Sequence, residues 1–252
     1  QSRRFNGSNI IRNAVGQPIS SYFGYEIVGF WNSQAEIDAA NETARKATNN
    51  PSAIYQTDAA VGRYRYNDFG AGIVTPDSRT FLGNANPDFN YGLNIALAYK
   101  AFDFSVFFYG VQGNEIWNQV KWWTDFYPSF AGGKSRTALY NSWTPTRTNA
   151  KVPIVENAGT FSSNGVPNSY YVEDGSYLRA KNMQIGYTVN QELLKKIGIS
   201  RLRAYVQAAN LFTITKYSGI DPEIGGGPNQ FGIDEGAYPT QRQIIFGLNV
   251  SF

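Results

Sequence analysis

This sequence lacks the residue types that most catalytic and metal sites require. Its 252 residues include no cysteine, no histidine and a single methionine. Without cysteine there can be no disulfide and no thiolate metal site. Without histidine the commonest general base and metal ligand are missing, and so is every Ser-His-Asp or Cys-His arrangement. We therefore expect no enzyme activity, no metal site and no cofactor.

Long apolar runs are also missing. Aromatic residues make up 15% of the chain, but mean hydropathy is −0.37, and no stretch approaches the roughly 20 apolar residues of a membrane-spanning helix. The opening residues, QSRRFNGSNI, lack the apolar core of a secretory signal peptide. Either processing has removed such a peptide or the chain begins partway through a longer protein, and we prefer the second explanation. Its lysines and arginines are dispersed, so nucleic acid is not an expected partner.

What the sequence does contain is a two-residue apolar period. At the C-terminus, Phe246, Leu248, Val250 and Phe252 occupy alternate positions, which is typical of a strand with one apolar face. The same period predicts antiparallel strands at 91–99, 102–108, 177–189, 201–213 and 240–252. Segments 20–30 and 61–68 are weaker strand candidates, the polar segment 34–48 is helical or flexible, and segment 190–200 predicts a helical turn closed by Gly198.

Short and long connections alternate between the predicted strands. The links at 100–103 and 190–200 are short, whereas segments 112–176 and 215–240 are long, rich in Gly, Pro, Ser, Thr and Asn, and predict loops. Outer-membrane β-barrels have short periplasmic turns and long extracellular loops. Tyr91 and Tyr99 also bracket an apolar stretch, as interfacial aromatics do. We therefore favour an all-β, antiparallel transmembrane barrel with the long loops outside, and keep a soluble β-sandwich as the alternative.

Several phrases resemble one family of proteins. In order they are GNANPDF, SYLRAKN, AANLFTITKYSGIDPE and YPTQRQ followed by a terminal phenylalanine. They resemble the C-terminal part of SusC/RagA-type TonB-dependent transporters, and the resemblance covers nearly the whole chain. It implies that residues 1–252 supply the C-terminal strands and outer loops of a 22-strand barrel in a Gram-negative outer membrane of the Bacteroidetes kind. The plug and the TonB-contacting segment of that family are not recognisable here.

The resemblance also implies a function and partners. These transporters import an oligomeric nutrient, such as a glycan or a peptide, together with a SusD-like surface lipoprotein. The expected partners are therefore the plug and early strands of the same transporter, this lipoprotein, TonB through a segment absent here, and the substrate. The terminal Phe252 resembles the signal read by the barrel-assembly machinery. The alternative function is that of a stand-alone small outer-membrane barrel or β-domain with a structural or surface-binding role.

An aromatic cluster gives the candidate ligand site. It consists of Trp117, Trp122, Trp123, Phe126 and Tyr127, just after a strand that should emerge outside the cell. Such rings could stack on a sugar or a peptide side chain, and the alternatives are a loop packed on its neighbours or an interfacial belt. We take Trp117, Trp122, Trp123 and Tyr127 as ligand-binding candidates, and Phe246, Leu248, Val250 and Phe252 as the closing strand.

Two carboxylate-bearing segments suggest weaker hypotheses. The SGIDPEI segment places Asp221 two residues from Glu223, but a glycosidase needs two carboxyls across a cleft, so a loop restrained by Pro222 is the simpler interpretation. The segment NDFGAGIVTPD lies where many relatives carry a calcium-loop-like DxNGDG motif. It retains Asp68 and Asp77 but has Ala71 where a carboxylate would stand. A Gly-rich turn is the favoured interpretation there.

Overall fold

The computed structural model describes residues 4–5, 8–227 and 230–252, and it divides the chain into two compact units. Unit 1 comprises Gln1–Asn86, Glu115–Glu173 and Ile224–Gly236. Unit 2 comprises Pro87–Asn114, Asp174–Glu223 and Ala237–Phe252. Among the described residues, no helix has both the length and the apolar character needed to cross a membrane. Each unit is described by itself.

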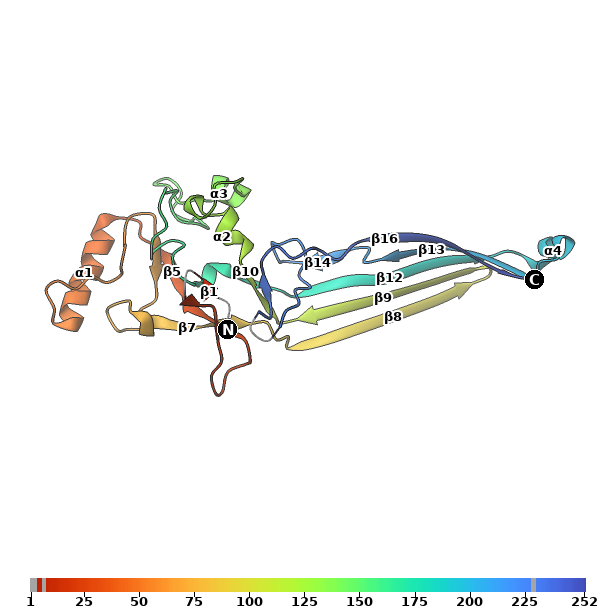
Figure 1. Cartoon of the computed structure of the whole chain (residues 1–252), viewed down its shortest axis with the longest axis horizontal. Coiled ribbons are helices and arrows are strands. Elements are labelled where there is room, and N and C mark those ends of the chain that lie inside the picture. The colour runs from red at the N-terminus through yellow and green to blue at the C-terminus, as the bar shows by residue number, and fades with distance from the viewer. Residues whose placement is uncertain (1–3, 6–7, 228–229) are drawn as a thin grey trace. The chain divides into compact units, whose positions relative to one another are not determined.

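Unit 2 is built around a six-stranded antiparallel sheet with the order β16-β13-β12-β9-β8, in which β14 also pairs with β12 (Figure 1). Its elements are β8 (Phe89–Tyr99), β9 (Phe102–Gln112), β12 (Tyr177–Thr188), α4 (Gln191–Leu194), η4 (Lys195–Ile197), β13 (Arg201–Ala209), β14 (Thr213–Thr215) and β16 (Gln243–Ser251). All five predicted strands are therefore present in one sheet. The predicted helical turn is α4 with η4, and it ends at Gly198 in the left-handed region (φ 73°).

One predicted strand is wrong in its last residues. The strand expected at 201–213 ends at Ala209, because Asn210 adopts a positive φ of 49° and turns the chain. The break lies opposite a bulge in β12 between Ala180 and Asn182, where the Asn210 N–H donates to the carbonyl of Lys181 (3.0 Å). A bulge bends its strand and increases the local twist, so the partner strand must adjust there. β14 then resumes the pairing with Tyr177, Leu178 and Arg179.

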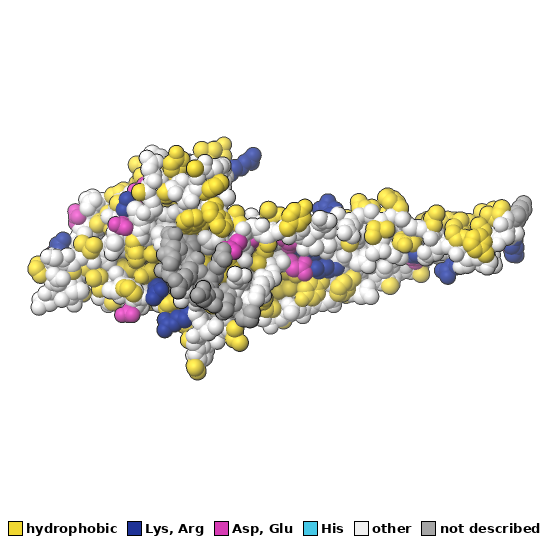
Figure 2. All heavy atoms as spheres, viewed as in Figure 1, with side chains coloured by type: hydrophobic (Ala, Val, Ile, Leu, Met, Phe, Trp, Pro, Cys, Tyr) yellow, Lys and Arg dark blue, Asp and Glu magenta, His cyan; other side chains and the backbone are white. Residues whose placement is uncertain are grey.

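The register gives the sheet two chemically different faces. Residues that lie opposite each other on neighbouring strands point to the same side of the sheet. One row of such partners crosses all five long strands and is apolar throughout: Leu97, Phe104, Ile185, Val206 and Phe246. This apolar face is largely exposed, and Figure 2 shows hydrophobic side chains along much of the sheet. The polar face carries, among others, Asn94, Asp103, Ser105, Gln184, Arg203, Gln207 and Asn249.

One end of the sheet carries the short links. The two-residue turn between β8 and β9, the α4–η4 link and the C-terminus all lie at this end (Figure 1). At the opposite end the chain enters β8, leaves β9, enters β12, leaves β14 and enters β16. The short and long connections that the sequence predicts therefore alternate between the two ends of this sheet.

Unit 1 consists of short strands and helices. Its strands are β1 (Arg4–Phe5), β2 (Ser8–Asn9), β3 (Ile11–Arg12), β4 (Ser21–Tyr25), β5 (Ile27–Phe30), β6 (Tyr64–Tyr66), β7 (Arg79–Asn84), β10 (Glu115–Asn118), β11 (Val172–Asp174, which ends at the boundary with unit 2) and β15 (Ile233–Asp234). Its helices are α1 (Gln34–Thr48), η1 (Pro76–Ser78), α2 (Val120–Thr124), η2 (Tyr127–Ser129), α3 (Arg136–Tyr140) and η3 (Ser169–Tyr171). α1 occupies the segment predicted to be helical or flexible. Ser33 caps its start by accepting from the Glu36 N–H.

The core of unit 1 is unusually aromatic. Trp31, Tyr22, Tyr64, Tyr66 and Trp117 are at most 1% exposed. The buried tyrosine hydroxyls have backbone partners, since Tyr22 Oη donates to the Gly232 carbonyl (2.8 Å) and Tyr66 Oη to the Phe161 carbonyl (3.0 Å). Burial raises the pKa of Tyr22, Tyr64 and Tyr66. These contacts join residues that are far apart in sequence, so much of segment 112–176, predicted as a loop, is part of this core.

Candidate functional site

The predicted aromatic site is divided between the core and the surface of unit 1. Trp117, on β10, is fully buried (0% exposed). Its ring stacks on Tyr171 (centroids 5.2 Å apart), and its Nε1 donates to the Gln119 side chain (2.9 Å). Trp117 therefore presents no free ring face to a solute in this structure, and its role here is packing.

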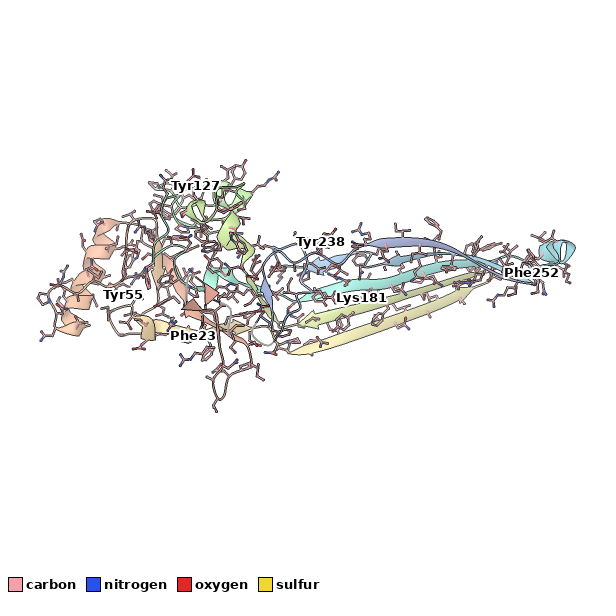
Figure 3. The ribbon with its side chains drawn as sticks, viewed as in Figure 1. Phe23, Tyr55, Tyr127, Lys181, Tyr238 and Phe252 are labelled. Atoms are coloured by element: carbon pink, nitrogen blue, oxygen red, sulfur yellow. The ribbon has the colours of Figure 1, made fainter. Side chains whose placement is uncertain are left out.

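The other candidate rings lie nearer the surface. Trp122 and Trp123 are half-buried on α2 and touch edge to face, with centroids 6.0 Å apart. Trp122 Nε1 donates to the Asn164 carbonyl (3.1 Å), which ties α2 to a distant segment. Tyr127, at the start of η2, is 57% exposed, and Figure 3 labels it near α2 and α3. Of the four predicted binding residues, it is the one whose ring is most available.

Tyr127 also lines a cavity of about 180 Å³. The walls come from segments that are well separated in sequence. Most of the lining is apolar, and its members include Phe126, Tyr127, Pro128, Ala138, Leu139, Pro153, Ile154, Val155 and Ala158. Tyr127, Pro128 and Lys134 border a second hollow, which Phe130, Ala131 and Gly132 complete.

Lys134 fixes the loop that forms one side of this cavity. Its Nζ donates to the carbonyls of Trp123 (2.8 Å), Phe126 (2.9 Å) and Phe130 (2.6 Å). An ammonium has three donors, so this arrangement uses all of them. Burial lowers the pKa of Lys134, and the nearby Asp125 carboxylate acts in the opposite direction.

Asp125 orients the helix on the other side of the cavity. Its carboxylate is 7% exposed and accepts hydrogen bonds from the hydroxyls of Ser135 and Tyr170. Ser135 is the N-cap of α3 and accepts from the Ala138 N–H (3.1 Å). Burial, followed by the charge of Asp125, raises the pKa of Tyr170. Asp125 thus determines where α3 places Ala138 and Leu139, so the cavity walls are held by a connected hydrogen-bond network.

In unit 2, the SGIDPEI carboxylates are bound by one arginine. Arg179, only 3% exposed, donates to Asp221 (2.5 Å) and Glu223 (2.6 Å). It also donates to the hydroxyls of Thr213 (2.8 Å) and Thr240 (3.0 Å). The two carboxylates therefore do not face each other across a cleft. Arg179 binds residues near both ends of the 215–240 segment and so attaches them to β12, which makes this arrangement a structural clamp.

A second ion pair crosses the polar face of the sheet. Asp103 on β9 accepts hydrogen bonds from Arg203 on β13, although β12 lies between these strands. The pair meets above Gly186, where an added Cβ would lie 2.4 Å from an Arg203 nitrogen and 2.5 Å from an Asp103 oxygen. Glycine at this position makes the contact sterically possible.

The candidate closing residues lie on the last strand. Phe246, Leu248 and Val250 pair with Val206, Ala204 and Leu202 of β13 and share the apolar face. They are exposed, at 77%, 69% and 43%. Phe252 follows β16 and is 92% exposed, at the chain end labelled in Figure 3. Their proposed role in assembly stays a prediction.

The segment with the calcium-loop-like spacing is a glycine-containing turn. Asp68 accepts from the Gly72 N–H (2.6 Å), and the Ala71 N–H donates to the Asp68 carbonyl (3.0 Å). Asp77 belongs to η1, which Thr75 caps. Within the described ranges, no group of three or more His, Cys, Asp or Glu side chains is placed to hold a metal ion.

No protein-family model matches the chain. The TonB-dependent receptor P26 of Formosa agariphila is 32% identical over 98% of this chain and 24% of its own length. The chain is homologous to SusC/RagA-type TonB-dependent receptors. Receptor P3 of the same organism is 34% identical over 94% of the chain and 22% of its own length, so the chain spans about a quarter of these curated relatives.

The solved structures agree on the fold. The RagAB peptide importer in its open-open state matches 94% of this chain and 23% of that chain, with a TM-score of 0.66 and 21% sequence identity. The homologous SusC/RagA-type receptors are transporters rather than enzymes. The expectation of no enzyme activity agrees with this family.

Proposed function

We propose that the chain is part of a TonB-dependent outer-membrane transporter that imports an oligomeric nutrient, a glycan or a peptide, together with a SusD-like surface lipoprotein. The observation that carries this proposal is the two-faced sheet of unit 2 in a chain homologous to such receptors. TonB-dependent receptors of this type are outer-membrane proteins of Bacteroidetes.

The sheet has the dimensions and surface of a membrane-spanning wall. β8 and β9 each have 11 residues and β12 has 12, and a transmembrane strand needs about 9 to 11. Leu93 (53% exposed), Leu97 (61%) and Phe246 (77%) lie on the apolar face, which lipid would cover. In water, such a surface would favour aggregation.

The edges of the sheet support the idea of a larger barrel. Among the described residues, β8 and β16 are the edge strands of this sheet, each with a single neighbouring strand. A strand in hydrocarbon must pair all of its backbone groups. We therefore propose that both edges pair with strands of the rest of the receptor and close a barrel of the 22-strand type. The plug and the TonB-contacting segment would belong to that other part of the receptor.

The proposed topology places the long connections outside. Loops gather on the extracellular side of such barrels and short turns on the periplasmic side. The turn at Lys100, the α4–η4 link and Phe252 would then lie in the periplasm, where the barrel-assembly machinery acts. The long connections, 112–176 and 215–240, would face the cell exterior and the lipoprotein lid, a partner that the two-component RagAB importer suggests.

The test uses the intact gene product from its native organism. An affinity tag, mild detergent extraction of outer membranes and mass spectrometry would give its mass, its protein partners and its co-purified ligand. We expect a product about four times the 28.0 kDa of this chain, with a lipoprotein attached. A mature outer-membrane protein of about 28 kDa without that partner would instead support the stand-alone barrel.

A further inference from the structure

We propose that the cavity beside Tyr127 binds one apolar side chain of an extended peptide, so that the imported nutrient is a peptide. This inference rests on the proposed transport function and narrows its substrate. It concerns a pocket that lies wholly within unit 1 and is built from described residues. Four properties of the pocket support this proposal: its size, the pairing of its polar groups, its exposed apolar rim and its preformed shape.

The size fits one side chain. The cavity has a volume of about 180 Å³. An engineered cavity of about 150 Å³ in another protein, lined by aliphatic and aromatic groups, binds benzene. The pocket therefore accommodates a phenyl ring or a branched aliphatic group. It is too small for several sugar rings.

Apart from the exposed Tyr127 at the rim, the polar side chains of the lining already have partners within unit 1. Ser142 donates to the Ala138 carbonyl, Ser163 to the Asn164 side chain, and Asn164 to the Ser129 hydroxyl. Glu156 is paired with Arg63 (2.6 Å), and Asp125 and Lys134 are engaged as described above. A sugar ring entering this pocket would give up its hydrogen bonds to water for groups that are already paired, which is costly. An apolar side chain makes no hydrogen bonds to water and therefore loses none when it enters the pocket.

The rim is apolar and exposed. Tyr127 (57% exposed), Leu139 (69%) and Val155 (59%) line the cavity and also present surface to solvent. Grouped exposed apolar side chains mark binding surfaces. The neighbouring hollow, which shares Tyr127, Pro128 and Lys134, offers space for the adjacent part of the same peptide.

The pocket is held in shape without a ligand. Lys134 closes the loop that carries Tyr127, and Asp125 positions α3 through Ser135. A preformed site avoids the ordering cost of binding. The concave shape and single-ring size favour a narrow, extended ligand. A folded protein surface would need a broad and shallow contact.

The experiment measures binding to the purified full-length receptor. The probes are a pentapeptide with a central phenylalanine or leucine, the same peptide with central alanine, and a linear oligosaccharide. We expect the phenylalanine or leucine peptide to bind about tenfold or more tightly than the alanine peptide, because pockets of this kind discriminate to that extent. Equal affinity for the peptides would overturn the inference.

Two matched variants test whether the preference for the apolar peptide depends on the cavity. Ala138→Leu fills the cavity from α3, whereas Ala39→Leu makes the same change at an exposed position of α1. Ala138→Leu should abolish the preference for the apolar peptide, and Ala39→Leu should leave it intact. Loss of lipoprotein binding by Ala138→Leu, with the peptide preference unchanged, would mean that the pocket serves the lid and would contradict the proposal.

A third measurement does not depend on the folding of any variant. A peptide bearing a photoreactive phenylalanine should crosslink the wild-type receptor at Tyr127 or Leu139, and crosslinks confined to other regions would overturn the inference. Binding of the oligosaccharide but of neither peptide would refute the pocket while leaving the transport proposal standing. A protein that crosslinks the peptide but is absent from the outer membrane would refute the transport proposal alone.

Discussion

Replacing Arg179 by methionine should strongly destabilise the attachment of the 215–240 segment. The Asp221 side chain is 8% exposed, so the substitution leaves a carboxylate buried without its cation. Breaking a buried ion pair in this way typically costs about 3 to 5 kcal/mol. Glu223 keeps Lys181 as a partner (2.7 Å), and Asp221 keeps the Thr240 N–H (2.8 Å). Because these contacts remain, we expect a loss of unfolding free energy at the lower end of that range, about 3 kcal/mol.

The assay is urea unfolding of the full-length receptor in detergent, combined with limited proteolysis of residues 215–240. Arg201→Met, which removes an exposed arginine from β13, is the matched control and should change the unfolding free energy by less than about 0.5 kcal/mol. Adding Asp221→Asn to Arg179→Met should recover part of the loss, because the neutral amide is cheaper to bury. A double variant as unstable as the sum of the two single variants would refute the argument.

The pH dependence gives an independent check of the same cluster. Burial alone would raise the pKa of Asp221, but hydrogen bonds from the Glu223 N–H, from Arg179 and from Thr240 outweigh it and lower the pKa to about 2. A depressed carboxyl pKa contributes stability above its unfolded value, and that contribution disappears as the pH falls through the folded value. We expect the wild type to lose about 2 kcal/mol between pH 4 and pH 2. Arg179→Met should lose much less over the same interval.

Three further predictions concern the sheet. Leu97→Arg should make outer-membrane insertion less favourable, by up to the about 2 to 4 kcal/mol that an arginine costs at the bilayer midplane. Ala98 lies opposite Asp103 on the polar face, so Ala98→Arg should insert normally; equal insertion of the two would mean that the register is wrong by one residue. Deleting Phe252 should cause periplasmic degradation, unlike Phe246→Ala, which removes a similar ring but keeps the chain end; equal outer-membrane amounts would favour simple anchoring of Phe252. Gly186→Val should separate Asp103 from its arginine and lower the unfolding free energy by about 1 to 3 kcal/mol, and a stability equal to that of wild type would exclude steric crowding at Gly186.

The strands of unit 2 could be predicted because their signal is local. Most of each long strand repeats an apolar residue at every second position, and the face that each side chain occupies follows from that period. The end of β13 could not be placed, because the bulge at Lys181 that faces Asn210 lies on another strand. The sequence contains only a weak signal there, namely that asparagine tolerates a positive φ.

The positions of the candidate rings could not be predicted in full, for a physical reason. The sequence places Trp117 and Tyr127 close together, but Trp117 is buried against Tyr171, far along the chain, whereas Tyr127 is 57% exposed. The cavity could not be predicted, because its walls come from segments that are separated in sequence, near residues 126, 138, 154 and 163. Lys134 was likewise missed, because a single lysine gives no indication that three carbonyls will surround it.

Unit 1 is assembled from three separate stretches of the chain, so its folding depends on contacts between residues that are far apart in sequence. β15 pairs in parallel with β10 through Ile233 and Trp117, and the Tyr22 hydroxyl binds the carbonyl of Gly232, 210 residues later. Long-range contacts of this kind slow folding, because the intervening chain must first be brought together. If the chain is exported from N- to C-terminus, as the proposed function requires, the aromatic segments around Tyr22 and Trp117 would emerge well before residues 232 and 233. They would remain vulnerable to aggregation until then, so unit 1 should depend on periplasmic chaperones for longer than the local β8–β9 hairpin does.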